Sequence, residues 1–228
     1  MGQIFLIRHG QASFGAENYD ALSPLGVEQA QLLGHWFADC GMTFDQVASG
    51  TMQRHQQTAQ TCLAALPAPR VMRTDADFNE YDHEDVLFRD SAEKLDVLHV
   101  LQAPSERPQR AFRQLFEQAM QRWIGGTHDT DYRETWSAFR RRTLGVIERL
   151  TIAAEVTDHC LVFTSGGTIA TICCDLLGAP DRKVPALAYE LANSSITRLR
   201  FRGGRVMLST LNGTPHLDRS HPQHITYR

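Results

Sequence analysis

The chain has 228 residues, 42% of them hydrophobic, which is enough to bury the core of one α/β domain without disulfides or metal ions. Its formal net charge of -3 argues against nucleic acid or an anionic membrane as a partner held by bulk charge. The start at Met1 shows no signal peptide, and no stretch of about 18 apolar residues follows, so we expect a cytoplasmic protein that does not enter a membrane.

The chain then alternates strands and helices. A short apolar strand over 4–7 runs into Arg8-His9-Gly10. Ser23 followed by Pro24 is typical of a helix start and predicts a helix over 24–40. The same reasoning predicts the next three elements: a strand over 44–48, a helix over 52–66 and a strand over 70–74. Strands that alternate with helices indicate a parallel sheet.

An acidic run over 79–85 interrupts this alternation. Three helical stretches follow it, over 92–102, 107–124 and 133–155. After them come a buried strand over 159–164 and a helix over 166–177. Two last strands, over 196–202 and 205–210, form a hairpin that turns at Gly203-Gly204. We therefore expect a three-layer α/β/α sandwich in a single domain over 1–228. Its core would comprise 1–78 and 156–213, with a helical insertion over 79–155 that covers the strand C-terminal ends.

Cysteine and histidine spacing gives no sign of a metal ion or cofactor. The five cysteines lack C-x-x-C spacing, which disfavours disulfides and zinc: Cys40, Cys62, Cys160, Cys173 and Cys174. Three late histidines lack the helix or carboxylate spacing of a metal site: His216, His221 and His224. We expect them to lie in a loosely held tail that begins at Thr214.

His9 follows a buried strand, at the position where ligands collect in α/β sheets. A neutral imidazole can attack phosphorus without losing a proton first. Arg8 offers a planar fork of donors that matches phosphate oxygens, and Gly10 lets the backbone approach a ligand closely. The tripeptide alone would be weak support for catalysis.

Four stretches extend this pattern: RHGQ over 8–11, YDALSPLGVEQA over 19–30, SGTMQRHQQTA over 49–59 and LVFTSGGT over 161–168. In order and spacing they resemble the histidine phosphatase superfamily, also called phosphoglycerate mutase-like, and its phosphatase branch in particular. The resemblance implies that His9 is the nucleophile, that Arg8 and Arg54 neutralise the phosphoryl charge, and that Glu80 is the general acid. Because acidic residues surround Glu80, Glu84 stays open as the alternative acid.

The chain departs from the family pattern at Ser165, where the family usually has a second histidine before the glycine pair. A serine and the N–H of Gly166 could still face a phosphate from a helix N-terminus. His83, three residues beyond Glu80, is a candidate replacement for the missing imidazole. Gln11 and Ser13 complete the candidate substrate-binding residues. We expect His55 to be a surface or packing histidine.

Three functions remain open. The favoured one is a metal-independent phosphomonoester hydrolase that acts through phosphohistidine on a small molecule or a phosphoprotein. The second is a phosphoglycerate mutase-type phosphoryl transfer, which the insertion resembles less well. The third is a catalytically weak phosphate-binding module, which Ser165 would explain. The sequence leaves open the substrate and whether the protein is a homodimer.

Overall fold

A six-stranded mixed sheet with strand order β3-β2-β4-β1-β5-β6 organises the molecule. The computed structural model describes residues 1–13, 20–66, 71–87, 108–155 and 158–227. The strands are β1 (Gly2–Arg8), β2 (Gln46–Ser49), β3 (Met72–Thr74), β4 (His159–Thr164), β5 (Ile196–Arg202) and β6 (Arg205–Gly213). The first four are mutually parallel, whereas β5 pairs antiparallel with both β1 and β6. The predicted α/β fold with a mostly parallel sheet is confirmed.

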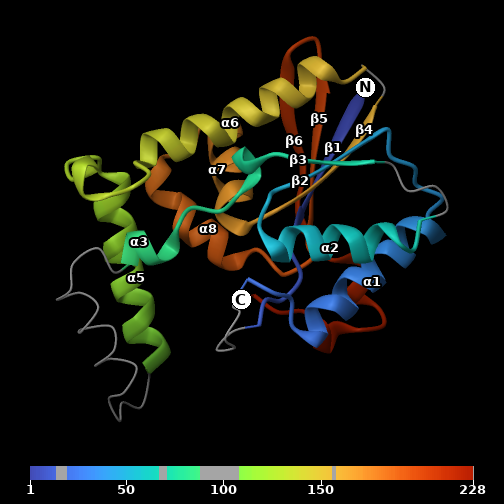
Figure 1. Ribbon diagram of the computed structural model, residues 1–228, viewed down its shortest axis with the longest axis horizontal. Coiled ribbons are helices and arrows are strands. Elements are labelled where there is room, and N and C mark those ends of the chain that lie inside the picture. The colour runs from blue at the N-terminus through green and yellow to red at the C-terminus, as the bar shows by residue number, and fades with distance from the viewer. Residues whose placement is uncertain (14–19, 67–70, 88–107, 156–157, 228) are drawn as a thin grey trace.

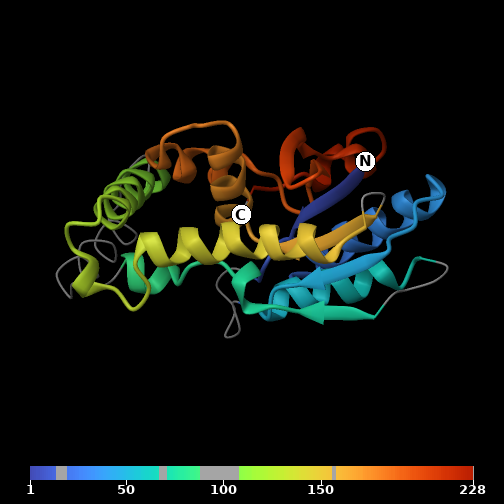
Figure 2. The same ribbon diagram turned by 90° about the horizontal axis from the view of Figure 1, so that it is seen from above.

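Helices lie on both sides of this sheet (Figures 1 and 2). The α-helices described are α1 (Pro24–Asp39), α2 (Gln53–Leu63), α3 (His83–Leu87), α5 (Pro108–Ile124), α6 (Trp136–Ala153), α7 (Gly166–Leu176), α8 (Val184–Glu190) and α9 (Pro215–Asp218). Short 3-10 turns are η1 (Ala76–Phe78), η2 (Asp129–Asp131), η3 (Asp181–Lys183) and η4 (Pro222–His224). Among the described residues, no helix is both long and apolar enough to cross a bilayer.

Alternating side chains of β1 explain the two helical layers. Ile4 and Leu6 belong to a buried cluster with residues of α6 and α7, whereas Phe5 and Ile7 belong to a second cluster with residues of α1 and α2. Successive side chains of a strand point to opposite faces, so one apolar strand fills both layers. This burial on both sides accounts for the uninterrupted apolar run over 4–7.

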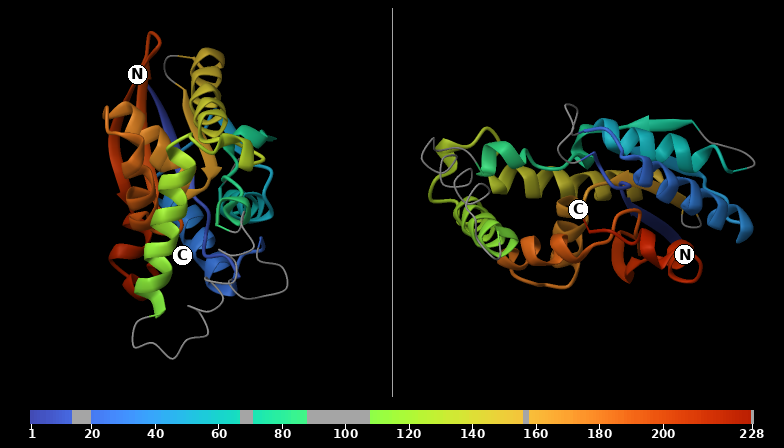
Figure 3. Two further views of the ribbon diagram at one scale, coloured as in Figure 1. Left: turned by 90° about the vertical axis from the view of Figure 1, so that its left-hand side faces the viewer. Right: turned by 90° about the horizontal axis from the view of Figure 1, so that it is seen from below.

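Aromatic packing joins α5 and α6 at one end of the molecule, with α3 beside α5 (Figures 1 and 3). The Trp123 ring of α5 lies 5.2 Å from that of Trp136 and 5.6 Å from that of Phe139, both on α6. It also lies 5.0 Å from the ring of Tyr81. Because Tyr81 follows Glu80 directly, this cluster holds the segment that carries the candidate acid.

Most predicted elements are present with end residues shifted. The helix expected over 133–155 spans Trp136–Ala153, because the Thr135 hydroxyl accepts the N–H of Ala138 and caps it. The hairpin turn is confirmed, and Gly203 and Gly204 both have positive φ, which suits glycine. The helix predicted over 92–102 lies outside the described residues, as does residue 70 of the predicted strand 70–74. Short helices α3, α8 and α9 were not predicted.

The prediction of a loose tail from Thr214 is wrong. Nε2 of His216 lies 2.8 Å from Oγ of Ser194 in a buried hydrogen bond, and Leu217 is fully buried. Further along, Gln29 donates from its amide to the carbonyl of His224, and Asn193 donates its backbone N–H to the carbonyl of Thr226. The polar sequence suggested solvation, but these groups bond to residues far away in the chain.

Candidate active site

The parallel pairing of β1 and β4 brings two predicted site residues together. Arg8 is in register with Thr164, and the N–H of His9 donates to the Thr164 carbonyl at 2.9 Å, which extends the ladder by one step. His9 and Ser165 therefore leave the sheet side by side. A ligand at this edge would meet the ends of both strands.

His9 is buried and its hydrogen bonding fixes its tautomer. Its Nδ1 lies 2.7 Å from the carbonyl oxygen of Gly10. A carbonyl only accepts, so Nδ1 carries the proton and the neutral ring keeps its lone pair on Nε2. Burial is the main influence that holds the pKa of His9 well below 6.5, followed by the positive charges of Arg54 and Arg8. The ring is thus neutral at pH 7.

Two glycines let the segment after His9 lie against α1. A Cβ on Gly10 would come within 2.4 Å of the Gly26 carbonyl oxygen, and one on Gly26 would come within 2.1 Å of the Gln11 carbonyl oxygen. Backbone therefore touches backbone here, and neither position has room for a side chain. Thr58 of α2 secures the same turn by accepting the Gly10 N–H at 3.0 Å.

Arg54 is the second residue of α2 and is buried. Its Nη1 lies 2.6 Å from Oδ1 of Asp20, and the second oxygen of Asp20 accepts the backbone N–H of Gln53. Asp20 thus aims the guanidinium while it satisfies a free N–H at the helix start. Sequence reasoning missed Asp20 as a functional residue, although it lies within the matching stretch 19–30.

Arg8 contacts the C-terminal segment. Its Nη1 donates to the carbonyl of Leu191 and, at 3.4 Å, to the carbonyl of Tyr227. Its Nε lies 3.4 Å from the position that a Cβ on Gly166 would take, which places the guanidinium beside the start of α7. The structure therefore brings Arg8 to the same strand ends as His9 and Ser165.

Glu80 reaches the start of α7, where the Gly167 N–H donates to its Oε2 at 2.8 Å. A Cβ on Gly167 would lie 2.2 Å from the other oxygen of Glu80, so a larger residue there would displace the carboxylate. Burial raises the pKa of Glu80 above 4.5, against the opposing effects of the Gly167 N–H and the Arg54 charge. Glu84, the alternative acid, is exposed. The geometry favours Glu80.

Arg142 of α6 fixes the segment that carries Glu80. It donates from Nη1 to the carbonyls of Asp77 and Asn79, at 3.1 and 2.8 Å, and from Nη2 to the carbonyl of Glu80 at 3.4 Å. Two further bonds to the Glu134 carboxylate, at 2.6 and 2.9 Å, hold the guanidinium in place. These bonds connect α6 to the candidate acid, which sequence reasoning did not predict.

The structure places His55 against Ser165. Nε2 of His55 lies 2.6 Å from Oγ of Ser165, and both residues are fully buried. Of the two expectations for His55, a surface histidine is wrong and a packing histidine is correct. His83 is half-buried and is the first residue of α3. Its pKa is lowered, mainly by burial and next by the nearby positive charge of Arg54.

The remaining candidates lie at the edge of the site. The Gln11 amide oxygen accepts the Ser23 hydroxyl at 2.8 Å, and the Ser13 N–H donates to the Ala21 carbonyl at 2.8 Å. Gln11 also lines a cavity of about 470 Å³ together with Tyr189, Glu190, Thr226 and Tyr227. Because Arg8 donates to the Tyr227 carbonyl, this cavity adjoins the arginine side of the site.

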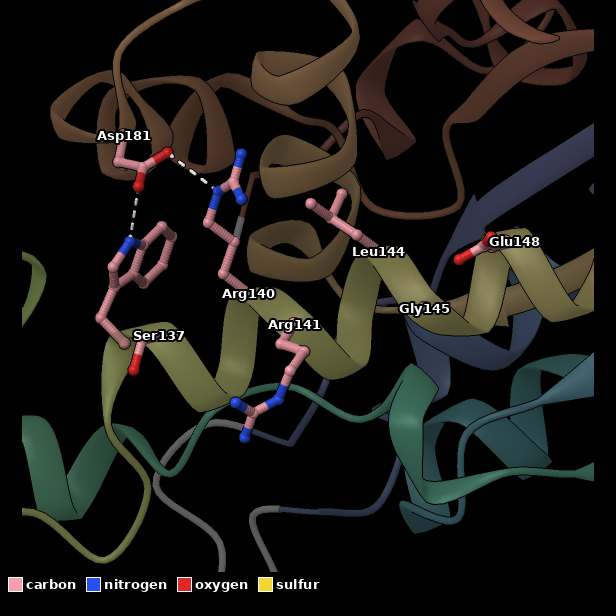
Figure 4. Close-up of a pocket in the computed structure, with 8 residues that line it drawn as sticks. Ser137, Arg140, Arg141, Leu144, Gly145, Glu148 and Asp181 are labelled. Carbon is pink, nitrogen blue, oxygen red and sulfur yellow. Dashed lines mark hydrogen bonds and ion pairs between the residues drawn. The ribbon is translucent and has the colours of Figure 1, made fainter. Parts of the chain in front are cut away.

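Another hollow, of about 510 Å³, lies along α6 (Figure 4). There Asp181 accepts the Trp136 indole N–H at 2.7 Å and Nε–H of Arg140 at 3.3 Å. None of the predicted site residues lines it. Within the described ranges there is also no group of three or more metal-ligating side chains.

Comparison with known proteins shows the family to which the chain belongs. A model of the histidine phosphatase superfamily (branch 1) matches residues 4–214. The mitochondrial serine/threonine-protein phosphatase PGAM5 of Mus musculus is 29% identical over 214 residues, which cover 92% of this chain and 62% of the mouse protein. The Caenorhabditis elegans protein of that name is 43% identical over 77 residues, 34% of this chain and 26% of its own.

Two solved structures share the fold. A phosphoserine phosphatase mutant from Entamoeba histolytica, in complex with phosphoserine, has a TM-score of 0.65 at 18% identity, covering 95% of this chain and 100% of its own. A phosphoglycerate mutase from Bacillus anthracis has a TM-score of 0.66 at 17% identity, covering 94% of each chain. With the family model matched over nearly the whole sequence, the chain belongs to branch 1 of the histidine phosphatase superfamily.

Proposed function

We propose that this protein is a metal-independent phosphomonoester hydrolase in which His9 carries the phosphoryl group. The observation that carries the proposal is the state of His9: a neutral ring whose Nδ1–H is held by the Gly10 carbonyl, which leaves Nε2 free to attack. Arg54 adds a buried positive charge near it, and Glu80 has a raised pKa. Nucleophile, charge and acid are the parts that phosphoryl transfer needs.

The reaction takes two displacements. Nε2 of His9 attacks phosphorus and the P–O bond to the leaving group breaks, while Glu80 gives its proton to the departing oxygen. Water then attacks the phosphorus of phosphohistidine, and Glu80 as carboxylate takes the proton from the water. The P–N bond breaks and its electron pair returns to Nε2. Arg8 and Arg54 offset the charge on the peripheral oxygens in both steps.

The substrate is a phosphomonoester of a small molecule or of a protein side chain. Support comes from the names of the related proteins, which include serine/threonine-protein phosphatases and a phosphoserine phosphatase with bound phosphoserine. The cavity of about 470 Å³ beside Gln11 has room for the organic part of such a substrate. Tyr189 and Tyr227 are among the residues that line this cavity.

An assay with para-nitrophenyl phosphate in the presence of EDTA tests this function. We expect steady release of inorganic phosphate at a rate that EDTA leaves unchanged. No turnover on any phosphomonoester would favour the phosphate-binding module, and a need for added divalent metal would contradict metal independence. Return of phosphate to a phosphoglycerate without net hydrolysis would favour the mutase.

Replacing Arg142 by alanine should separate the position of Glu80 from its chemistry. The carbonyls of Asp77, Asn79 and Glu80 lose their donor, so the acid shifts away from the leaving group. We expect kcat on an alkyl phosphate to fall about tenfold, equivalent to about 1.4 kcal/mol, with a smaller loss on an aryl phosphate. Arg133→Ala, at an exposed arginine, is the control. Equal kcat for Arg142→Ala and wild type would contradict the positioning role.

A further inference from the structure

His55 is an imidazole that the mechanism above does not use, although it lies beside the nucleophile. Its ring centroid is 5.7 Å from that of His9, with 34° between the ring planes. It comes from the first turn of α2, next to Arg54, and no part of it is exposed. A buried imidazole this close to His9 can influence the orientation of the His9 ring.

Ser165 anchors His55 instead of capping its own helix. Ser165 is the N-cap residue of α7, a position where serine commonly accepts a helix N–H, yet its side chain makes no such bond. Its hydroxyl bonds to Nε2 of His55 at 2.6 Å. The contact spans 110 residues of sequence and connects the N-terminal ends of α2 and α7.

The protonation of His55 follows from its surroundings. Nδ1 is buried and has no hydrogen-bond partner among the described residues. A buried N–H without an acceptor is rarer than an unsatisfied acceptor, so Nδ1 carries the lone pair and Nε2–H donates to Ser165. Burial, and next the charge of Arg54, lowers the pKa of His55 well below 6.5, which keeps the ring neutral.

The backbone at Gly50 limits the space available to the ring of His55. A Cβ on Gly50 would lie 2.2 Å from Nδ1 of His55, so the ring rests directly on the backbone at the end of β2. With Gly50 behind it, Ser165 holding Nε2 and His9 beside it, the imidazole is fixed on three sides. A side chain fixed in this way can restrict a neighbour that must keep one orientation.

We propose that His55 is a positioning residue of the active site, which holds the imidazole of His9 in its reactive orientation and is itself anchored by Ser165. The inference rests on the proposed function, because it concerns the nucleophile of that reaction. Without His55 the ring of His9 borders an empty space and can turn away from phosphorus. A displacement of about 1 Å from the line of attack can cost about 100-fold in rate.

Kinetics of four variants test the proposal. We expect His55→Ala to lower kcat at least about tenfold while KM stays within about threefold, because orientation of the nucleophile matters in the transition state. Ser165→Ala should lower kcat less, since the ring stays but loses its anchor. The double variant His55→Ala/Ser165→Ala should be no slower than His55→Ala, because both residues act through one contact.

The fourth variant, His55→Ala/Ser165→His, moves the imidazole to the other end of the hydrogen bond, at the N-cap of α7. A ring on residue 165 can reach the space that His55 leaves. The kcat should therefore be at least about threefold higher than that of His55→Ala, a difference typical of the interaction energy between neighbouring residues. Cys62→Ala is the matched control, since it also removes a fully buried side chain from α2 but in a different part of the core. It should lower the melting temperature and leave kcat unchanged.

The outcomes separate this proposal from the function itself. If wild-type protein hydrolyses para-nitrophenyl phosphate and His9→Ala does not, the function stands. Wild-type kcat in His55→Ala would then overturn the role of His55 alone, as would strict additivity of the two alanine substitutions. A higher KM at unchanged kcat would also overturn it, because that pattern indicates substrate binding and not orientation of His9. If wild-type protein shows no turnover, both proposals fall.

Discussion

Replacing His9 by alanine is expected to lower kcat by at least about a thousandfold, because the variant lacks the atom that accepts the phosphoryl group. The fold should persist, since the backbone N–H of His9 still donates to Thr164 and its carbonyl still accepts the Ser194 N–H. The measurement is steady-state hydrolysis of para-nitrophenyl phosphate, with circular dichroism to confirm folding. His35→Ala, at an exposed histidine of α1, is the control and should keep full activity.

One outcome would contradict this prediction. A His9→Ala variant that retains wild-type kcat would exclude His9 as the nucleophile.

The neutral state of the His9 ring also predicts how activity changes on the acidic side of the pH profile. Because the pKa of His9 is well below 6.5, the neutral form persists at mildly acidic pH, and loss of activity through protonation of His9 should begin only below pH 6.5.

Replacing Glu80 by glutamine should have an effect that depends on the leaving group. An alkoxide needs a proton in the transition state, so kcat/KM on an alkyl phosphate should fall by about 10²–10⁴. An aryl phosphate with an acidic phenol leaves without that proton, so its kcat/KM should stay within about threefold of wild type. The comparison is made with one alkyl and one nitrophenyl substrate under identical conditions.

The same variant tests the pH dependence. Glu80 donates only when protonated, and burial raises its pKa above 4.5, so wild-type kcat/KM on the alkyl phosphate should fall as the pH rises through that raised pKa. The glutamine variant should lack this decrease, while the ionisation of the substrate itself is common to both proteins. Glu84→Gln, at the exposed alternative, should behave as wild type. Equal losses on both substrates would show that Glu80 is not the acid.

The sequence predicted the features that local patterns determine. The apolar run over 4–7 is buried on both faces in the centre of the sheet, and His9 follows the last residue of β1, so strand and candidate nucleophile were both visible. The Ser23-Pro24 helix start was equally visible, and the Ser23 hydroxyl accepts the Gly26 N–H. Hydrophobic periodicity and capping residues act over a few positions, which is why sequence reasoning finds them.

Contacts between distant residues could not be predicted in this way. His55 bonds to a serine 110 positions away, and Arg142 reaches residues 77–80 across more than 60 positions. The expectation that His83 would replace the histidine absent at 165 relied on closeness to Glu80 along the chain. The replacement by His83 stays a prediction. The fold adds a contact that the sequence did not predict: α2 follows β2 and α7 follows the paired strand β4, and this brings His55 to Ser165.

Rapid-quench labelling tests the covalent mechanism most directly. Wild-type protein is mixed with a ³²P-labelled phosphomonoester in EDTA, quenched within milliseconds and digested for mass spectrometry. We predict a label that is stable in base, labile in acid and located on the peptide that contains His9, formed and lost at rates that match turnover. A label on a different residue, or turnover without any label on His9 at any time point, would contradict a phosphohistidine intermediate.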